Sequence, residues 1–137
     1  FPPLGTPAVP LIAGFAKALE LAVRDRESER VRLNSLSSQF IENINYAFPK
    51  AEVAQIMPNA VNVSVPGILP EFLVLALDRQ GVMVSAGPAC NSRKPEPHGI
   101  HVMDSVPVRF SFGRGTTEKE LKKAIKIFCR ICTSMLK

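Results

Sequence analysis

The sequence contains no long uninterrupted run of apolar residues. Its longest apolar stretch, residues 8–22, is interrupted by Pro10, Gly14, Lys17 and Glu20. The stretch is therefore too short and too polar to span a bilayer. The chain also lacks the basic start and small-residue cleavage site of a secretory signal. We expect no membrane-spanning segment and no membrane partner.

Cysteine is scarce as well, and its odd count of three argues against a disulfide framework. Reduced thiols indicate a cytoplasmic compartment, or the mitochondrial matrix in a eukaryote. Cys129 and Cys132 form a C-x-x-C, but no second such motif and no paired histidine motif completes a zinc site. Because both cysteines fall within an amphipathic pattern, we expect them to pack in the core and predict no metal site.

Repeats and low-complexity tracts are also absent. The 137 residues are 46% hydrophobic and 21% charged, which lets a chain of this length bury one core and excludes disorder. We therefore predict a single domain spanning residues 1–137. The chain opens with Phe1-Pro2-Pro3 rather than methionine, so we expect a fragment, a processed product or an excised domain.

Positive charge is concentrated near the C-terminus. Residues 109–137 hold eight basic and two acidic side chains, a balance of +6 within a net charge of +5. Such a patch can attract nucleic acid, an anionic membrane or an acidic protein, although a solvated helix face is the commoner explanation. Both interpretations stay open at this point.

Apolar periodicity predicts three helices, over residues 11–48, 70–80 and 117–135. The first is one long helix or two abutting ones and ends before Pro49. The second begins at Pro70, a residue type that suits the first helical position. The third begins with a capping box formed by Thr117 and Glu120, and carries an apolar stripe on one side and lysines on the other.

Alternation of apolar and polar residues predicts short strands, over residues 53–56, 61–65, 82–85 and 106–112. Asn59 precedes the second strand and is expected to form a turn. In the last strand Arg109 points away from the apolar face. Helices and short strands in this order predict an α+β fold, with a small, mainly antiparallel sheet covered on one face by helices.

Cys90 is the cysteine whose surroundings suit chemistry. It follows a predicted strand in a long loop and lies near Arg93, Lys94 and His98. Nearby positive charge favours the thiolate, the nucleophilic form. An inert buried thiol is the alternative. His98 and His101 could act as a base, although solvated loop histidines are commoner.

The guanidinium of Arg109 is the candidate ligand for an anion. Its planar fork matches the geometry of a carboxylate. The strand pattern places it opposite the core, where a substrate can reach it. A structural salt bridge is the alternative and fits the spacing equally well.

Four stretches, taken in chain order, resemble the NifS-type cysteine desulfurases. Two of the stretches are specific for this family when they occur together: a motif of small residues that ends in cysteine (residues 84–90), and the motif VRFSxGRxTT (residues 108–117). The resemblance extends from Gly5 almost to the C-terminus. The stretches are residues 5–10 (GTPAVP), 58–64 (PNAVNVS), 84–90 (VSAGPAC) and 108–117 (VRFSFGRGTT).

The resemblance implies the small C-terminal domain of a homodimeric fold-type I enzyme that depends on pyridoxal phosphate. Cys90 would then be the catalytic nucleophile that takes sulfur from cofactor-bound L-cysteine as a persulfide, while alanine leaves. Arg109 would bind the substrate carboxylate. Thr6 would lend its hydroxyl to the cofactor phosphate of the neighbouring subunit.

The family's cofactor lysine lies in a segment that this sequence does not contain. We therefore expect no pyridoxal phosphate on this chain alone and no activity without a cofactor-binding domain or subunit. The implied acceptor is a scaffold or other sulfur-accepting protein, as in iron-sulfur cluster assembly. Two alternatives remain: a non-catalytic module whose basic helix binds an acidic partner or nucleic acid, and a stand-alone sulfur or redox carrier that uses Cys90.

Overall fold

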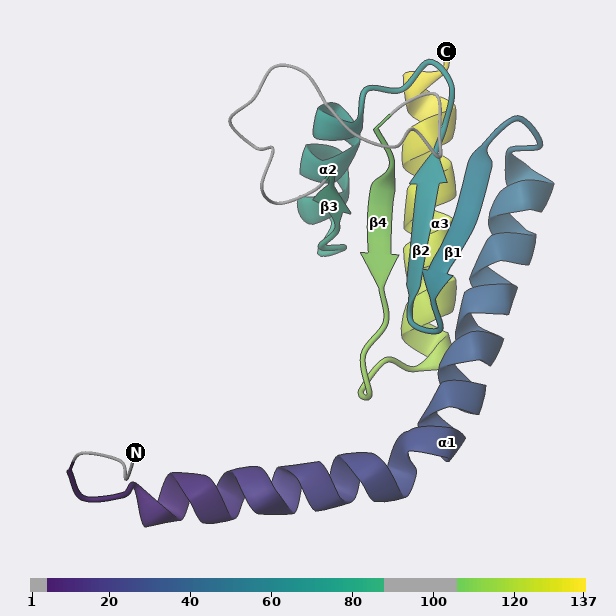
Figure 1. The fold of residues 1–137 in the computed structure, drawn as a ribbon. Coiled ribbons are helices and arrows are strands. Elements are labelled where there is room, and N and C mark those ends of the chain that lie inside the picture. The colour runs from purple at the N-terminus through teal and green to yellow at the C-terminus, as the bar shows by residue number, and fades with distance from the viewer. Residues whose placement is uncertain (1–4, 88–105) are drawn as a thin grey trace.

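The computed structural model describes residues 5–87 and 106–137. These residues form three helices and a small sheet, in the predicted chain order. Figure 1 shows how the elements are arranged. The elements are α1 (Val9–Ala47), β1 (Glu52–Met57), β2 (Ala60–Ser64), α2 (Pro70–Asp78), β3 (Ser85–Ala86), β4 (Val108–Ser111) and α3 (Glu118–Met135).

The sheet has the strand order β1-β2-β4-β3, and every neighbouring pair is antiparallel. Asn59 lies in the tight turn between β1 and β2, as predicted. The backbone N–H of Phe112 donates to the carbonyl oxygen of Asn59 at 2.8 Å, and the Asn59 amide donates to the carbonyl oxygen of Phe112 at 3.3 Å. This turn therefore also fixes the end of β4.

β3 is shorter than the predicted strand over residues 82–85 and begins only at Ser85. The reason lies at the end of α2, where Gly81 adopts a φ of +75°. The backbone N–H of Val82 donates to the carbonyl oxygen of Leu77 at 3.0 Å. Because that N–H closes the helix, the chain joins the sheet three residues later.

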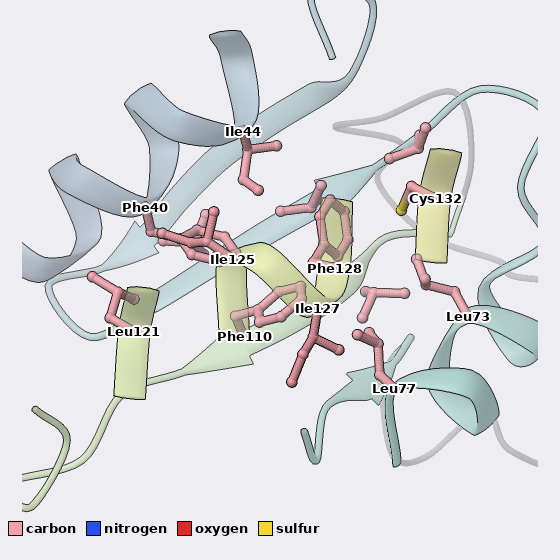
Figure 2. Close-up of a cluster of buried hydrophobic side chains, with 14 of the residues drawn as sticks. Phe40, Ile44, Leu73, Leu77, Phe110, Leu121, Ile125, Ile127, Phe128 and Cys132 are labelled. Carbon is pink, nitrogen blue, oxygen red and sulfur yellow. The ribbon is translucent and has the colours of Figure 1, made fainter. Parts of the chain in front are cut away.

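The core lies between one face of the sheet and the helices (Figure 2). Phe110 of β4 is at its centre, with ring centroids 4.7 Å from Phe40 of α1 and 5.5 Å from Phe128 of α3. Val61 and Val63 of β2 are fully buried on the same face. These contacts confirm the predicted α+β fold with helices on one face of the sheet.

α1 is a single helix whose two halves have different surroundings. The second half packs on the core through Leu36, Phe40 and Ile44. The first half extends away from the sheet (Figure 1), and every side chain from Val9 to Glu20 is exposed. We call residues 9–24 the α1 arm. Its apolar residues therefore contact none of the core.

α3 begins with the predicted capping box. The Thr117 hydroxyl accepts the backbone N–H of Glu120 at 3.2 Å, and the Glu120 carboxylate accepts the backbone N–H of Thr117 at 2.8 Å. The helix then buries Leu121, Phe128 and Cys132. Within residues 5–87 and 106–137, no helix is both long enough and apolar enough to cross a membrane.

Candidate functional site

Arg109 lies on the face of the sheet that the helices leave open. Its neighbours Val108 and Phe110 point into the core, so strand alternation turns Arg109 outward, as predicted. The side chain is exposed. No hydrogen bond or ion pair joins its guanidinium to another described residue. The fork is therefore available to an anionic ligand, which argues against the structural salt bridge within the described part of the chain.

The ladder places Arg109 between Asn62 of β2 and Ser85 of β3. Cross-strand partners in an antiparallel sheet project to the same face. Asn62 and Ser85 are half-buried, so the open face presents a polar row around the guanidinium.

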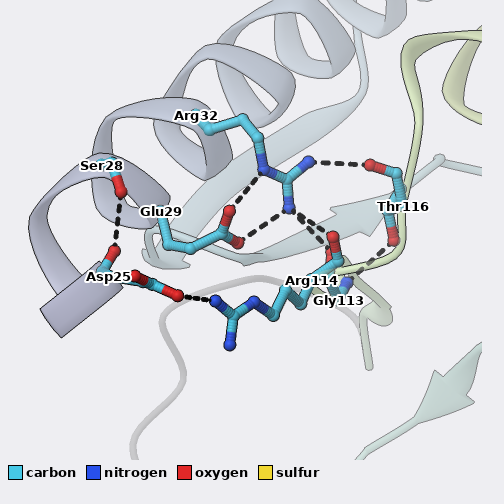
Figure 3. A network of polar contacts seen from close by, with 7 residues as sticks. All are labelled: Asp25, Ser28, Glu29, Arg32, Gly113, Arg114 and Thr116. Atoms are coloured by element: carbon cyan, nitrogen blue, oxygen red, sulfur yellow. Dashed lines mark hydrogen bonds and ion pairs between the residues drawn. The ribbon is translucent and has the colours of Figure 1, made fainter. Parts of the chain in front are cut away.

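The loop that follows β4 is fixed by Arg32 of α1 (Figure 3). The Arg32 guanidinium donates to the carbonyl oxygens of Gly113 at 3.1 Å, Arg114 at 3.1 Å and Thr116 at 2.8 Å. Glu29 accepts two further N–H groups of the same guanidinium at 3.0 Å each. These five bonds involve all three guanidinium nitrogens of one arginine and join α1 to the loop that follows the strand carrying Arg109.

A second contact at the same place is the ion pair between Asp25 of α1 and Arg114. Asp25 also accepts a hydrogen bond from Arg24 at 2.6 Å. The Arg24 bond, supported by Arg114, lowers the pKa of the Asp25 carboxyl, while partial desolvation opposes the shift. Likewise Arg32 lowers the pKa of Glu29. Both carboxylates therefore stay charged in mildly acidic solution. The sequence analysis did not identify this network.

Thr6 precedes α1 and is exposed. Because the arm extends away from the sheet (Figure 1), the structure does not bring Thr6 and Arg109 together within one chain. Cys90, His98 and His101 lie outside the described residues, so the predictions for them stay predictions.

The other two cysteines pack in the core, as predicted. Cys132 is fully buried, and burial raises the pKa of its thiol to about 12. Cys129 is half-buried, and burial raises the pKa of its thiol as well. Neither thiol is a ready nucleophile at neutral pH. The described residues contain no group of three or more histidine, cysteine or acidic side chains that could hold a metal ion.

The described surface includes two hollows that Arg109 does not line. One, of about 310 Å³, lies beside β4 and α3 and is lined by Phe110, Thr116 and Lys123 among others. The other, of about 560 Å³, lies beside α2 and the end of α3 and is lined by Phe72, Leu75 and others.

Comparison with known proteins identifies the class. The family model described as aminotransferase class-V matches residues 4–124. The chain therefore belongs to the class-V aminotransferase family, whose members depend on pyridoxal phosphate. The resemblance given by the sequence motifs is confirmed.

Curated members of this family that are similar to the chain include cysteine desulfurases. A cysteine desulfurase IscS of Dictyoglomus turgidum is 33% identical over 138 aligned residues, which cover 93% of this chain and 35% of that protein. A cysteine desulfurase IscS of Rickettsia typhi is 31% identical over 136 residues, covering 91% and 33%. The chain spans about a third of the length of the curated relatives it matches.

Solved structures confirm the fold. A structure titled NIFS-like protein matches with a TM-score of 0.74 and 24% identity, over 94% of this chain and 35% of that chain. The NifS-like protein from Rickettsia africae also gives a TM-score of 0.74, at 19% identity, over 94% and 36%.

The described residues fit only part of a pyridoxal phosphate site. Thr6 offers a hydroxyl group, and Arg109 offers a guanidinium that can bind a carboxylate. No strand of the sheet carries a lysine, and the lysines of α3 lie across the sheet from Arg109. The described residues therefore suit binding of the substrate and of a phosphate oxygen, and do not supply a lysine beside Arg109 to hold the cofactor.

Proposed function

We propose that this chain is the small C-terminal domain of a cysteine desulfurase and acts with a pyridoxal-phosphate-binding domain or subunit. The observation that carries the proposal is Arg109, an exposed guanidinium with no partner among the described residues, on the open face of the sheet. A planar fork of this kind binds a carboxylate through two parallel hydrogen bonds. Arg109 would hold the carboxylate of L-cysteine and so orient its sulfur.

Cys90 is the proposed nucleophile. Its thiolate forms a bond to the substrate sulfur while the bond between that sulfur and the substrate β-carbon breaks. The electron pair stays with the substrate, which gains a proton and leaves as alanine, and Cys90 keeps the sulfur as a persulfide. Pyridoxal phosphate, when bound, stabilises the negative charge that develops on the substrate. A scaffold or other acceptor protein then takes the sulfur.

The exposed apolar surface of the α1 arm is evidence that the chain packs against a cofactor-binding domain or subunit. Six of its large apolar side chains are between 53% and 75% exposed, and a seventh, Leu21, is half-buried. Its only charged residues are Lys17, Glu20 and Arg24. A helix that is apolar on most sides is normally buried in a larger protein. We propose that the arm packs against the cofactor-binding domain and brings Thr6 to the cofactor phosphate. The six exposed apolar residues are Val9, Leu11, Ile12, Phe15, Leu19 and Val23.

The experiment joins the chain to a class-V cofactor domain and adds pyridoxal phosphate and L-cysteine. Mass spectrometry of the tryptic peptides should then find a sulfur adduct 32 Da heavier on the peptide that contains Cys90. Cys90→Ser should abolish alanine release. Cys129→Ser is the matched control and should leave alanine release unchanged. Sulfur on Cys129 or Cys132 without sulfur on Cys90 would refute the assignment.

The contribution of the arm is tested separately. Phe15→Asp places a charge on the apolar surface and should weaken retention of pyridoxal phosphate in the joined protein. Val31→Asp changes another exposed apolar residue of α1, beyond the arm, and should leave retention unchanged. Equal retention in both variants would contradict burial of the arm.

A second candidate function uses the basic face of α3. Lys119, Lys122 and Lys126 are exposed on one side of the helix, and among the described residues only Lys122 has an acidic partner, Glu118 at 3.9 Å. Such a stripe suits an acidic protein or nucleic acid. If α3 has this function, its binding of an acidic protein or nucleic acid should weaken steeply as the salt concentration rises. Cys90→Ala should not change that binding.

A further inference from the structure

The α1 arm meets the rest of its helix at a bend (Figure 1). The helix is continuous across this bend. Leu21, Asp25 and Glu29 are half-buried there, while the residues between them, 22–24 and 26–28, are exposed. A spacing of four residues places the three side chains on one side of the helix. Through Asp25, that side contacts the loop that follows β4 (Figure 3).

Asp25 ties the base of the arm to that loop. Its carboxylate accepts hydrogen bonds from Arg24, at 2.6 Å, and from Arg114. Among the described residues, it is the first residue of α1 with a hydrogen bond or ion pair to any residue that follows the helix. The Asp25 side chain is only 20% exposed, against 61% for Arg114. The carboxylate is therefore largely covered and has two arginine partners, unlike an isolated surface ion pair, which contributes little.

Arg114 is itself held in place by the second half of α1. Its carbonyl oxygen accepts a hydrogen bond from the Arg32 guanidinium at 3.1 Å. The residues around it close a turn, in which the Thr116 N–H donates to the Gly113 carbonyl oxygen at 3.0 Å and the Gly113 N–H donates to the Thr116 hydroxyl at 2.8 Å. Asp25 and Arg32 lie about two turns of helix apart. The loop therefore braces α1 across the base of the arm.

The helix also has a local reason to bend at this place. The Ser28 hydroxyl donates to the backbone carbonyl oxygen of Asp25 at 2.9 Å. In a regular helix that oxygen accepts the backbone N–H four residues further on, which is that of Glu29. A serine hydroxyl that competes for such a carbonyl weakens the hydrogen bonding of the helix and often bends it. Ser28 therefore allows the bend but does not by itself fix the direction of the arm.

A small change at the bend becomes a large one at the start of the arm. Residues 9–24 span about 24 Å at about 1.5 Å per residue, so a turn of about 10° moves the start of the helix by about 4 Å. Thr6 lies just before that start. A hydroxyl must come within about 3 Å of an oxygen to form a hydrogen bond with it. The direction of the arm therefore decides which groups Thr6 can reach.

We propose that Asp25 and Arg114 are positioning residues for the α1 arm: their ion pair fixes the direction of the arm, and so the placement of Thr6 at the cofactor phosphate. The inference rests on the proposed function, in which the arm packs against the cofactor-binding domain. Neither residue binds the cofactor in this arrangement. Loss of the pair leaves the core intact but lets the arm turn about its base, so that its apolar surface and Thr6 no longer fit the cofactor-binding domain together.

The first test measures the direction of the arm in the 137-residue chain, without cofactor. Residual dipolar couplings of the backbone N–H groups, recorded by NMR, give the orientation of residues 9–24 relative to residues 33–47. Arg114→Met removes the ion pair and should turn the arm by about 10° or more. Arg114→Lys keeps the charge and should turn the arm less. Arg30→Met is the matched control and should leave the direction unchanged, because among the described residues Arg30 pairs only with Glu27, on the same helix.

The second test measures retention of pyridoxal phosphate by the chain joined to a cofactor domain. Arg114→Met should lose the cofactor several times faster than the wild type, and Arg30→Met should lose it at the wild-type rate. The chemical shifts of α3 guard against misfolding and should match the wild type in every variant, because the Arg114 side chain is exposed and lies outside the core. An arm whose direction is the same in Arg114→Met as in the wild type would overturn the proposal.

The two tests separate this inference from the proposed function. If Arg114→Met leaves the direction of the arm unchanged while Phe15→Asp still weakens retention of the cofactor, the ion pair has no positioning role and the proposed function stands. If Arg114→Met turns the arm, and neither this variant nor Phe15→Asp affects retention, the ion pair does fix the arm, but the proposed packing of the arm against the cofactor-binding domain fails.

Discussion

Phe40 of α1 and Phe110 of β4 face each other across the core with their ring centroids 4.7 Å apart and their planes tilted by 44°. Phe110 is the direct neighbour of Arg109 in β4, so this contact sets the position of the strand that presents the guanidinium. Phe40 has no exposed surface. The contact between these two rings therefore links the packing of α1 on the sheet to the position of Arg109 on the open face.

Phe40→Ala should destabilise the fold by about 3–5 kcal/mol, because it removes a fully buried ring and leaves a cavity under β4. Denaturant unfolding of the chain measures the change. Tyr46→Ala is the control, since this aromatic residue of the same helix is 91% exposed and its loss should cost less than about 0.5 kcal/mol. Similar losses in both variants would contradict the packing described for α1.

The fold could be predicted from the sequence where its signals are local. Thr117 and Glu120 are three residues apart, and each satisfies the backbone N–H of the other, so the start of α3 can be read without tertiary knowledge. The outward position of Arg109 is local too, because it follows from alternation with Val108 and Phe110.

Other features could not be predicted because they depend on distant partners. Arg32 bonds carbonyl groups 81 to 84 residues further along the chain, and only its pairing with Glu29 is visible in the sequence. Ile127 is buried outside the predicted apolar stripe, because α2 packs against α3 on that side. In the arm, Phe15 fits the same helical periodicity as Phe40. Periodicity indicates an apolar face but does not identify what covers it.

Arg32→Gln should loosen the loop between β4 and α3. The substitution removes the donors to three backbone carbonyls and the pairing with Glu29. Amide hydrogen exchange should therefore become several times faster at Thr116, whose N–H donates to the carbonyl oxygen of Gly113 at 3.0 Å. Arg30→Gln is the matched control, because among the described residues Arg30 pairs only with Glu27, on the same helix. Unchanged exchange at Thr116 in Arg32→Gln would contradict the role given to this arginine.

Thr117→Ala should weaken α3 by about 1 kcal/mol, the usual cost of losing a helix N-cap. The backbone N–H and hydroxyl of Thr117 lower the pKa of the Glu120 carboxyl, so the variant should move that pKa part of the way back towards its ordinary value. A carboxyl with a lowered folded-state pKa contributes stability above its unfolded pKa and loses it as the pH falls through the folded value. The difference in stability between the two proteins should therefore shrink below about pH 4.

The measurements for Thr117 are thermal melting between pH 3 and pH 7 and an NMR titration of the Glu120 side chain. Thr117→Ser retains a hydroxyl at the cap and should keep both the melting temperature and the lowered pKa. A Glu120 pKa that does not move in Thr117→Ala would show that the capping box is not formed in solution.

Cys132 should resist alkylation as long as the chain is folded. Its pKa of about 12 leaves roughly one thiol in ten thousand ionised at pH 8, and its side chain is fully buried. Iodoacetamide at pH 8 should therefore modify Cys90 first, if that thiol is the accessible nucleophile proposed, then the half-buried Cys129, and Cys132 only after unfolding. Peptide mass spectrometry follows the three sites in one sample, and the same reaction in guanidinium chloride, where all three should react alike, is the control. Rapid labelling of Cys132 in the folded chain would contradict the core packing of the C-x-x-C pair.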